Sequence, residues 1–216
     1  MSMKLDVVTI NFVNEPIKEG LDENIFSELT IFCMELFPII EHITNPIIHL
    51  KSDKHSKMTI NPLFLELEFG NASITSPNYI ELANKIARYY YDLLKVTTLQ
   101  QLNCKFTSVF PAAKEEDYKE GEVRKLFKDV KLFIPKSITR KIASKDALFG
   151  VRLIFEEDNV RYDLRVEPYL RGVKNNFVEL RAVTKNVNLD QVSNFIKTQE
   201  NFFLKDILNL LEADHG

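Results

Sequence analysis

The sequence predicts a soluble α+β protein with a mainly antiparallel sheet, helices packed on one face and a long C-terminal helix. Two observations carry this prediction. Apolar and charged residues alternate in three consecutive strand-length runs between residues 147 and 185, and apolar residues recur at helical spacing in three longer segments. Side chains change face at every residue of a strand, whereas residues three or four apart share a helix face. A chain of 216 residues is long enough to bury a sizeable core around such elements.

The three alternating runs predict a three-stranded meander with one buried face and one charged face. Because the side-chain period of a strand is two, each run places its apolar residues together on one side. These residues are Phe149, Val151, Leu153 and Phe155 in the first run, Val160, Tyr162, Leu164 and Val166 in the second, and Val178, Leu180 and Ala182 in the third.

The N-terminal part predicts the order β-α-β-β-α-β, which is that of a split βαβ unit. Pro38 lies inside the first helix and should kink or shorten it near its end. Ser76 and Pro77 form a good start for the second helix, because serine caps free amides and proline at the first turn loses no hydrogen bond. The expected elements are a strand at 5–13, a helix at 23–43, strands at 46–51 and 57–69, a helix at 76–95 and a strand at 102–110.

The remaining segments complete a single domain over residues 1–216. Its parts are a β-α-β-β-α-β half at 1–111, a charge-rich connector at 112–146, and the meander with the C-terminal helix at 147–216. The connector is expected to hold a short helix at 115–128 and a strand at 130–134. Asn188 is expected to cap the last helix, at 189–212. No linker rich in Gly, Ser or Pro separates two halves, and the sequence shows no internal repeat.

Composition and charge restrict the classes of partner and location. The 28 basic and 31 acidic side chains leave a formal charge of −3, which disfavours nucleic acid as a partner because duplex binders usually present a basic field. No stretch approaches the roughly 20 apolar residues needed to span a bilayer. No signal-peptide pattern is visible, so we expect a cytoplasmic protein without membrane contact. Cys33 and Cys104 fall in apolar segments and are expected to be buried, reduced thiols.

No catalytic constellation, metal site or cofactor site is recognisable, so catalytic residues stay unassigned and we expect no cofactor and no metal. The glycines are scattered and form no phosphate-binding loop. The histidines His42, His49, His55 and His215 show no metal-ligand spacing. No Gly-x-Ser-x-Gly nucleophile motif occurs, and thiols buried in apolar surroundings are inert.

The charged face of the meander is the candidate binding surface. One interpretation is a salt-bridged face that keeps the sheet soluble, since opposite charges across strands contribute about 0.2–1 kcal/mol each. The other is recognition of a polar ligand or partner, because arginines offer fork-shaped donors for carboxylate or phosphate groups. Four arginines and no lysine at these positions favour the second interpretation slightly. The candidate residues are Arg152, Arg161, Asp163, Arg165, Glu167, Glu179 and Arg181.

A basic stretch at 131–145 is a second candidate surface, for nucleic acid or an acidic protein. It includes Lys136, Arg140, Lys141 and Lys145, and five acidic residues between positions 115 and 122 stand close enough to neutralise it.

The leading functional hypothesis is non-catalytic recognition of a protein partner, or self-association, through the charged sheet face and a sheet edge. The main alternative is a small-molecule-binding protein or enzyme with a Phe-rich pocket between the sheet and the C-terminal helix. Nucleic-acid binding through residues 131–145 is the weaker alternative, and it predicts an affinity that falls steeply with salt.

Overall fold

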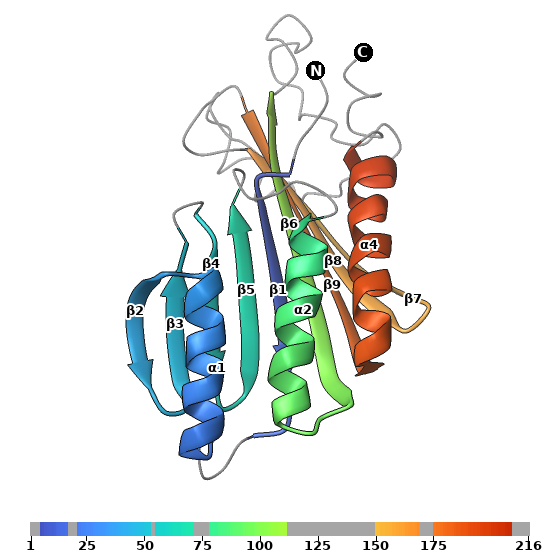
Figure 1. The fold of residues 1–216 in the computed structure, drawn as a ribbon. Coiled ribbons are helices and arrows are strands. Elements are labelled where there is room, and N and C mark those ends of the chain that lie inside the picture. The colour runs from blue at the N-terminus through green and yellow to red at the C-terminus, as the bar shows by residue number, and fades with distance from the viewer. Residues whose placement is uncertain are drawn as a thin grey trace, which may run out of the picture.

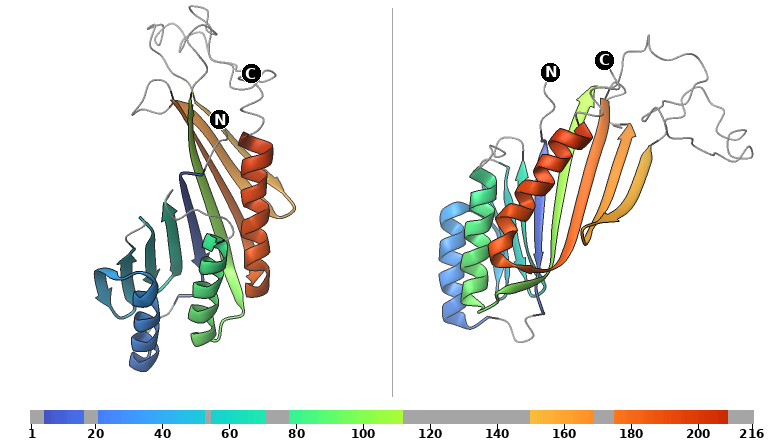
Figure 2. Two further views of the ribbon diagram at one scale, coloured as in Figure 1. Left: turned by 45° about the horizontal axis from the view of Figure 1, so that its top comes forward. Right: turned by 90° about the vertical axis from the view of Figure 1, so that its right-hand side faces the viewer.

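A nine-stranded antiparallel sheet in the order β2-β3-β4-β5-β1-β6-β9-β8-β7 forms the centre of the molecule. The structure is a computed structural model that describes residues 5–16, 21–52, 55–70, 78–111, 150–168 and 175–208. The helices α1, α2 and α4 lie on one face of this sheet (Figures 1 and 2). The α+β class, the antiparallel sheet and the helices on one face are therefore confirmed.

The bounds of the elements are as follows. The strands are β1 (Val7–Val13), β2 (Ile39–Thr44), β3 (Ile47–Lys51), β4 (Lys57–Asn61), β5 (Phe64–Gly70), β6 (Thr98–Pro111), β7 (Val151–Glu157), β8 (Val160–Pro168) and β9 (Asn175–Asn188). The helices are α1 (Glu23–Leu36), α2 (Asn78–Leu93) and α4 (Val192–Asn201). A 3₁₀ turn, η3 (Leu189–Gln191), precedes α4, and a π-helical stretch, η4 (Phe202–Leu208), continues it.

The strand order is symmetric about the central pair of β1 and β6. Outward from β1 come β5, β4 and β3, and outward from β6 come β9, β8 and β7. In each half a helix follows the strand next to the centre, α2 after β5 and α4 after β9, and each helix packs against that strand. The sequence shows no repeat, so this internal symmetry is a property of the topology. In the first half, α1 and β2 stand between β1 and β3; among the described residues the second half has no counterpart of them.

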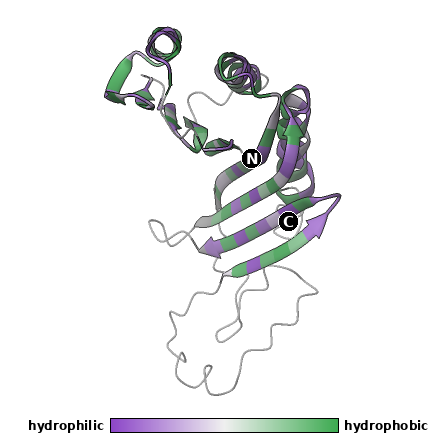
Figure 3. Cartoon of the chain, turned by 90° about the horizontal axis from the view of Figure 1, so that it is seen from below, coloured by the Kyte–Doolittle hydropathy of each residue, from purple (hydrophilic) through white to green (hydrophobic). Residues whose placement is uncertain are grey.

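The core lies between the sheet and the helices. Val8, Ile10 and Phe12 of β1 are fully buried, and their neighbours on the strand point to the other face. Figure 3 shows the resulting alternation of hydrophobic and hydrophilic bands along the strands. Because apolar burial is the dominant favourable term in folding, this layer holds the helices to the sheet. Phe106 of β6 stacks on Phe203 of the C-terminal helical stretch, with ring centroids 5.8 Å apart.

The meander is confirmed, with one correction at its outer strand. The register joins β9 to β8 and β8 to β7 without a break, and the apolar residues of β8 and β9 are buried as expected. Leu153 and Phe155 of β7 share the face predicted for them but are 38% and 36% exposed. The reason is that α4 packs on β6 and β9 and does not extend over β7. Phe149 lies outside the described residues.

The first predicted helix was too long. It begins at Glu23, with Asp22 as its N-cap, and ends at Leu36; residues 39–44 form the edge strand β2. Pro38 accounts for the boundary, because a proline disfavours helical geometry in the residue before it and offers no amide to the helix.

The single strand predicted at 57–69 is two strands, β4 and β5, joined by a tight turn. The side-chain oxygen of Asn61 accepts hydrogen bonds from the amides of Leu63 and Phe64, at 2.8 and 3.1 Å. Asparagine bonding to the backbone two residues on is a common way to fix a turn. Leu63 lies in this turn and is exposed.

The C-terminal helical stretch is confirmed, but its predicted cap is wrong. The side-chain oxygen of Asn188 accepts a hydrogen bond from the Thr98 hydroxyl at 3.1 Å and caps no helical amide. The connector predicted at 112–146, with its helix and strand, lies outside the described residues, as do Ser76 and Pro77.

A buried carboxyl group lies between the helices α2 and α4. Glu200 of α4 is 5% exposed and faces the hydroxyl of Tyr79 on α2. Burial raises the pKa of Glu200, because desolvation disfavours the charged form, while the Tyr79 hydroxyl partly offsets this rise. The folded state therefore favours the protonated acid more than the unfolded state does.

We expect the free energy of unfolding of Glu200→Gln to increase relative to that of the natural chain as pH rises. The neutral acid contributes stability fully below the pKa of an unfolded glutamate, about 4.3. This contribution is lost as pH rises through the higher pKa of the folded state. Urea unfolding between pH 4 and pH 8 measures the difference in free energy, and Glu157→Gln, an exposed site, is the control. A difference that stays constant with pH would show that Glu200 has an ordinary pKa.

Candidate functional site

The sheet face opposite the helices, called here the open face, carries the candidate site. It consists of the side chains that alternate with the buried ones along the strands, and no described helix covers it (Figure 2). All seven residues predicted for the site lie on this face of β7, β8 and β9: Arg152, Arg161, Asp163, Arg165, Glu167, Glu179 and Arg181. Their role in binding stays a prediction.

Apart from Lys105 of β6, the described side chains at the centre of the open face are uncharged, and most are polar. On β1, Thr9 and Asn11 face outward, and on β6, Asn103 and Gln101 do so. The amide of Asn11 donates to Glu66 at 3.1 Å, and the amide of Gln101 donates to Asn103 at 2.7 Å. The register places Asn11 directly opposite Asn103, so the two halves of the sheet meet in a strip of amide and hydroxyl groups.

An arginine cluster lies beside this strip. Arg152 of β7 and Arg165 of β8 are directly opposite each other, and Asp163 lies next to both. The Arg152 guanidinium donates two hydrogen bonds to the Asp163 carboxylate, from Nε at 2.8 Å and from an Nη at 2.6 Å. Arg165 Nε is 3.9 Å from the same carboxylate. A bidentate bond of this kind fixes the geometry of the guanidinium more firmly than a single contact does.

The charges in the cluster set the pKa of Asp163. Hydrogen bonds from Arg152 lower this pKa, partial burial opposes the change, and the charges of Arg165 and Arg181 add to the lowering. The same bonds raise the pKa of Arg152. Asp163 therefore stays ionised and holds two guanidinium groups of like charge side by side.

Two further basic residues extend the cluster toward the central strip. Arg181 of β9 pairs in register with Lys105 of β6, and Arg161 of β8 lies opposite Glu156 of β7. Among the described residues, no ion pair engages Arg161 or Arg181, and both are exposed. The sequence did not place Lys105 in the site, because nothing local in it reveals that β6 pairs with β9.

Three buried polar atoms of the open face have no hydrogen-bond partner in the protein: Thr9 Oγ1, Asn11 Oδ1 and Arg165 Nε. Thr9 lies in register between Glu68 and Lys105, whose long side chains flank it. Buried polar groups are nearly always satisfied in folded proteins, so unsatisfied ones call for a physical reason. A partner that displaces the flanking side chains would reach these atoms.

The cysteines and histidines do not form a reactive or metal-binding group among the described residues. Cys33 and Cys104 are both free and fully buried, and burial raises the pKa of Cys33 to about 12. His42 and His49, seven residues apart in the sequence, are neighbours across β2 and β3, with ring centroids 6.0 Å apart. Within the described ranges no three His, Cys, Asp or Glu side chains converge as a metal site would require.

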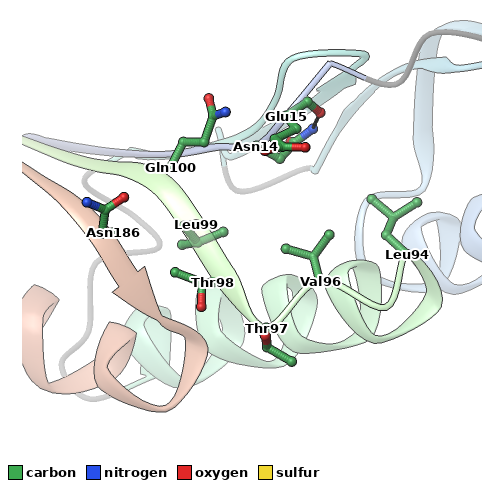
Figure 4. Close-up of a pocket in the computed structure, with 9 residues that line it drawn as sticks. All are labelled: Asn14, Glu15, Leu94, Val96, Thr97, Thr98, Leu99, Gln100 and Asn186. Carbon is green, nitrogen blue, oxygen red and sulfur yellow. Dashed lines mark hydrogen bonds between the residues drawn. The ribbon is translucent and has the colours of Figure 1, made fainter.

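A cavity of about 560 Å³ lies at one end of the sheet, away from the arginine cluster. It is formed by the end of β1, the connection from α2 to β6, and Asn186 of β9 (Figure 4). Its lining includes Leu94, Val96 and Leu99 beside Asn14 and Gln100. The predicted Phe-rich pocket with an arginine at its mouth would have to lie between the sheet and the C-terminal helix, and this cavity lies elsewhere.

No protein-family model matches the chain, and no curated protein is significantly similar to it in sequence.

The basic residues Lys136, Arg140, Lys141 and Lys145 lie outside the described residues, so the second candidate surface stays a prediction. Among the described helices none is long and apolar enough to cross a membrane.

We expect Arg152→Gln to raise the pKa of Asp163 more than Arg165→Gln does. Arg152 makes two short hydrogen bonds to this carboxylate, whereas Arg165 lies 3.9 Å from it. NMR titration of the Asp163 carboxyl carbon measures both shifts. Because the pKa of Asp163 is lowered in the folded state, its stabilising contribution is present above the unfolded value of about 3.9 and is lost as pH falls through the folded value.

An equal or larger shift in Arg165→Gln would contradict this assignment and make Arg165 the main partner of Asp163. Asp163→Asn gives the matching stability experiment. Its loss of stability should be visible at pH 7 and should vanish as the pH falls below the pKa of Asp163.

Proposed function

We propose that this protein is a non-catalytic recognition protein that binds a protein partner on its open face. The observation that supports this most directly is the arginine cluster on β7, β8 and β9. One carboxylate fixes Arg152 by a bidentate bond, while Arg161 and Arg181 stay exposed and form no ion pair with a described residue. Preorganised guanidinium groups on an accessible face suit carboxylate groups of a partner.

The mixture of charges on this face favours a protein partner over a nucleic acid. Glu156, Glu167 and Glu179 lie among the arginines, so the face alternates in sign and does not form a continuous basic field. A polyanion would meet repulsion at each of these glutamates. A protein surface can match both signs, and the strip of amide and hydroxyl groups on β1 and β6 offers hydrogen-bonding groups between the charged flanks.

The support for a small-molecule site is weaker. The cavity beside Asn14 and Leu99 is large enough for a ligand, since ligand pockets usually measure about 300–1,000 Å³. Its only charged lining residue is Glu15, which is exposed. Small-molecule binding at this end of the sheet is therefore the second proposal, and thermal-shift screening would test it.

The proposal on the open face is tested with Arg161→Ala combined with Arg181→Ala. Neither arginine forms an ion pair with a described residue, so we expect the variant to fold normally. The natural full chain is immobilised, proteins bound from a cell extract are quantified by mass spectrometry, and each candidate is then measured as a purified protein. We expect a directly binding protein whose affinity falls about tenfold or more in the double variant, because each lost charge-assisted bond contributes about 1.5–3 kcal/mol when desolvated.

The control is Lys85→Ala combined with Lys197→Ala, which removes two positive charges from exposed sites on the helices. It should retain the partner at its natural affinity. If every purified candidate binds both double variants equally well, the open face is a solvated surface and the proposal is wrong.

A further inference from the structure

The two edges of the sheet differ in how far they are protected against pairing with another strand. An edge strand offers unpaired amides and carbonyls, and proteins commonly protect such edges with bulges, prolines or charges. At the β2 edge the register is interrupted by a bulge between Ile40 and His42, Pro38 directly precedes the strand, and Glu41 forms an ion pair with Lys51. The β2 edge therefore carries three such protections.

The β7 edge has neither a bulge nor a proline, and of these protections it keeps only charge, with Arg152 paired to Asp163 of β8. Its seven residues pair with β8 in one uninterrupted register, and it contains neither proline nor lysine. Three consecutive apolar residues lie at its centre, of which Ile154 is 53% exposed. Phe155 stacks on Tyr162 of β8, with ring centroids 4.8 Å apart, and Tyr162 contacts Phe202 of the C-terminal helical stretch, at 5.3 Å. An apolar surface thus runs from the core out to this edge.

The sequence of β7 is complementary to itself in the antiparallel direction. If two copies pair about a two-fold axis at Ile154, each Ile154 faces the Ile154 of the second copy. Leu153 then faces Phe155 of the second copy, and Arg152 faces Glu156 of the second copy, each twice by symmetry. Apolar residues meet apolar residues and opposite charges meet, which are the cross-strand pairs that stabilise sheets.

We propose that the β7 edge pairs with the β7 edge of a second copy of this chain, so that the sheets of two molecules join through a two-fold axis at Ile154. The charge complementarity of Arg152 and Glu156 argues for this occupant. The chain's own segment 130–134, which the sequence predicts to be a strand, has Lys131 as its only charged residue and cannot supply both ion pairs. This pairing uses the edge of the sheet and shares Arg152 with the open face, because Arg152 bonds Asp163 through Nε and one Nη and can offer its other Nη to Glu156 of the second copy.

The first experiment is analytical ultracentrifugation of the full chain over a range of concentrations. We expect the natural protein to shift from the mass of one chain, 25.1 kDa, toward twice that mass as its concentration rises. Ile154→Lys places two like charges together at the axis, and it should stay at the mass of one chain. Ile40→Lys is the matched control, because Ile40 is 51% exposed at the opposite edge, and it should dimerise as the natural protein does.

A natural protein that keeps the mass of one chain at every concentration overturns the proposal. Loss of the dimer in Ile40→Lys but not in Ile154→Lys overturns it as well, and assigns the contact to β2. Circular dichroism of both variants, each substituted at an exposed site, checks that they are folded.

The second experiment tests the register and does not depend on the lysine variant. Ile154→Cys introduces an accessible thiol, since the two natural cysteines are fully buried. A short bismaleimide should link two copies of Ile154→Cys efficiently, and it should link Glu157→Cys poorly because residue 157 faces residue 151 of the second copy. If both variants are linked equally well, the proposed register is wrong. A maleimide–succinimidyl ester reagent, which joins a thiol to an amine, tests the other occupant: absence of the dimer together with a cross-link from the thiol introduced at position 154 to Lys131 of the same chain shows that the chain covers its own edge, and overturns the proposal.

Discussion

The antiparallel pairing of β1 with β6 is the interaction on which the rest of the structure depends. It joins two half-sheets of matching strand order, and no other described strand pair connects them. Side chains reinforce both ends of the pair: the Tyr91 hydroxyl donates to the carbonyl of Phe12 at 3.0 Å, and the Thr107 hydroxyl donates to the carbonyl of Val7 at 3.2 Å. If this pairing opened, the core under the helices would divide and the open face would lose its continuous central strip.

The placement of all described helices on one side of the sheet has two consequences for function. It leaves one wide polar face in which a strip of amide and hydroxyl groups, with Lys105 beside Thr9, separates two charged flanks, and the arginines of β7, β8 and β9 occupy one flank. It also leaves β7 beyond the reach of α4, so that Leu153 and Phe155 stay partly exposed at the edge. The face and the edge meet at β7, and a dimer formed through β7 would place two open faces in one continuous sheet.

The sequence predicted those features that depend on local patterns and missed those that depend on distant pairing. Alternation in β7, β8 and β9 was strong enough to give the meander, the buried face of β8 and β9, and all seven candidate residues of the open face. The strand β2 was missed because Ile39, Ile40 and Ile43 extend the helical spacing of α1, and Pro38 alone marks the change. Lys105 was not assigned to the site because its partner in register is Arg181, 76 positions further along the chain, and the symmetric strand order leaves no trace in the sequence.

Hydrogen exchange measured residue by residue tests the central role of the β1–β6 pair most directly. Amides in the most stable part of a protein exchange only through global unfolding, whereas those at edges exchange through local opening. We expect the paired amides of β1 and β6, such as those of Ile10 and Cys104, to be among the slowest in the chain and to exchange with the free energy of global unfolding. The amides of the edge strand β2 should exchange faster. If β1 and β6 exchange as fast as β2, the two half-sheets separate in solution and the continuous open face does not exist as a stable surface.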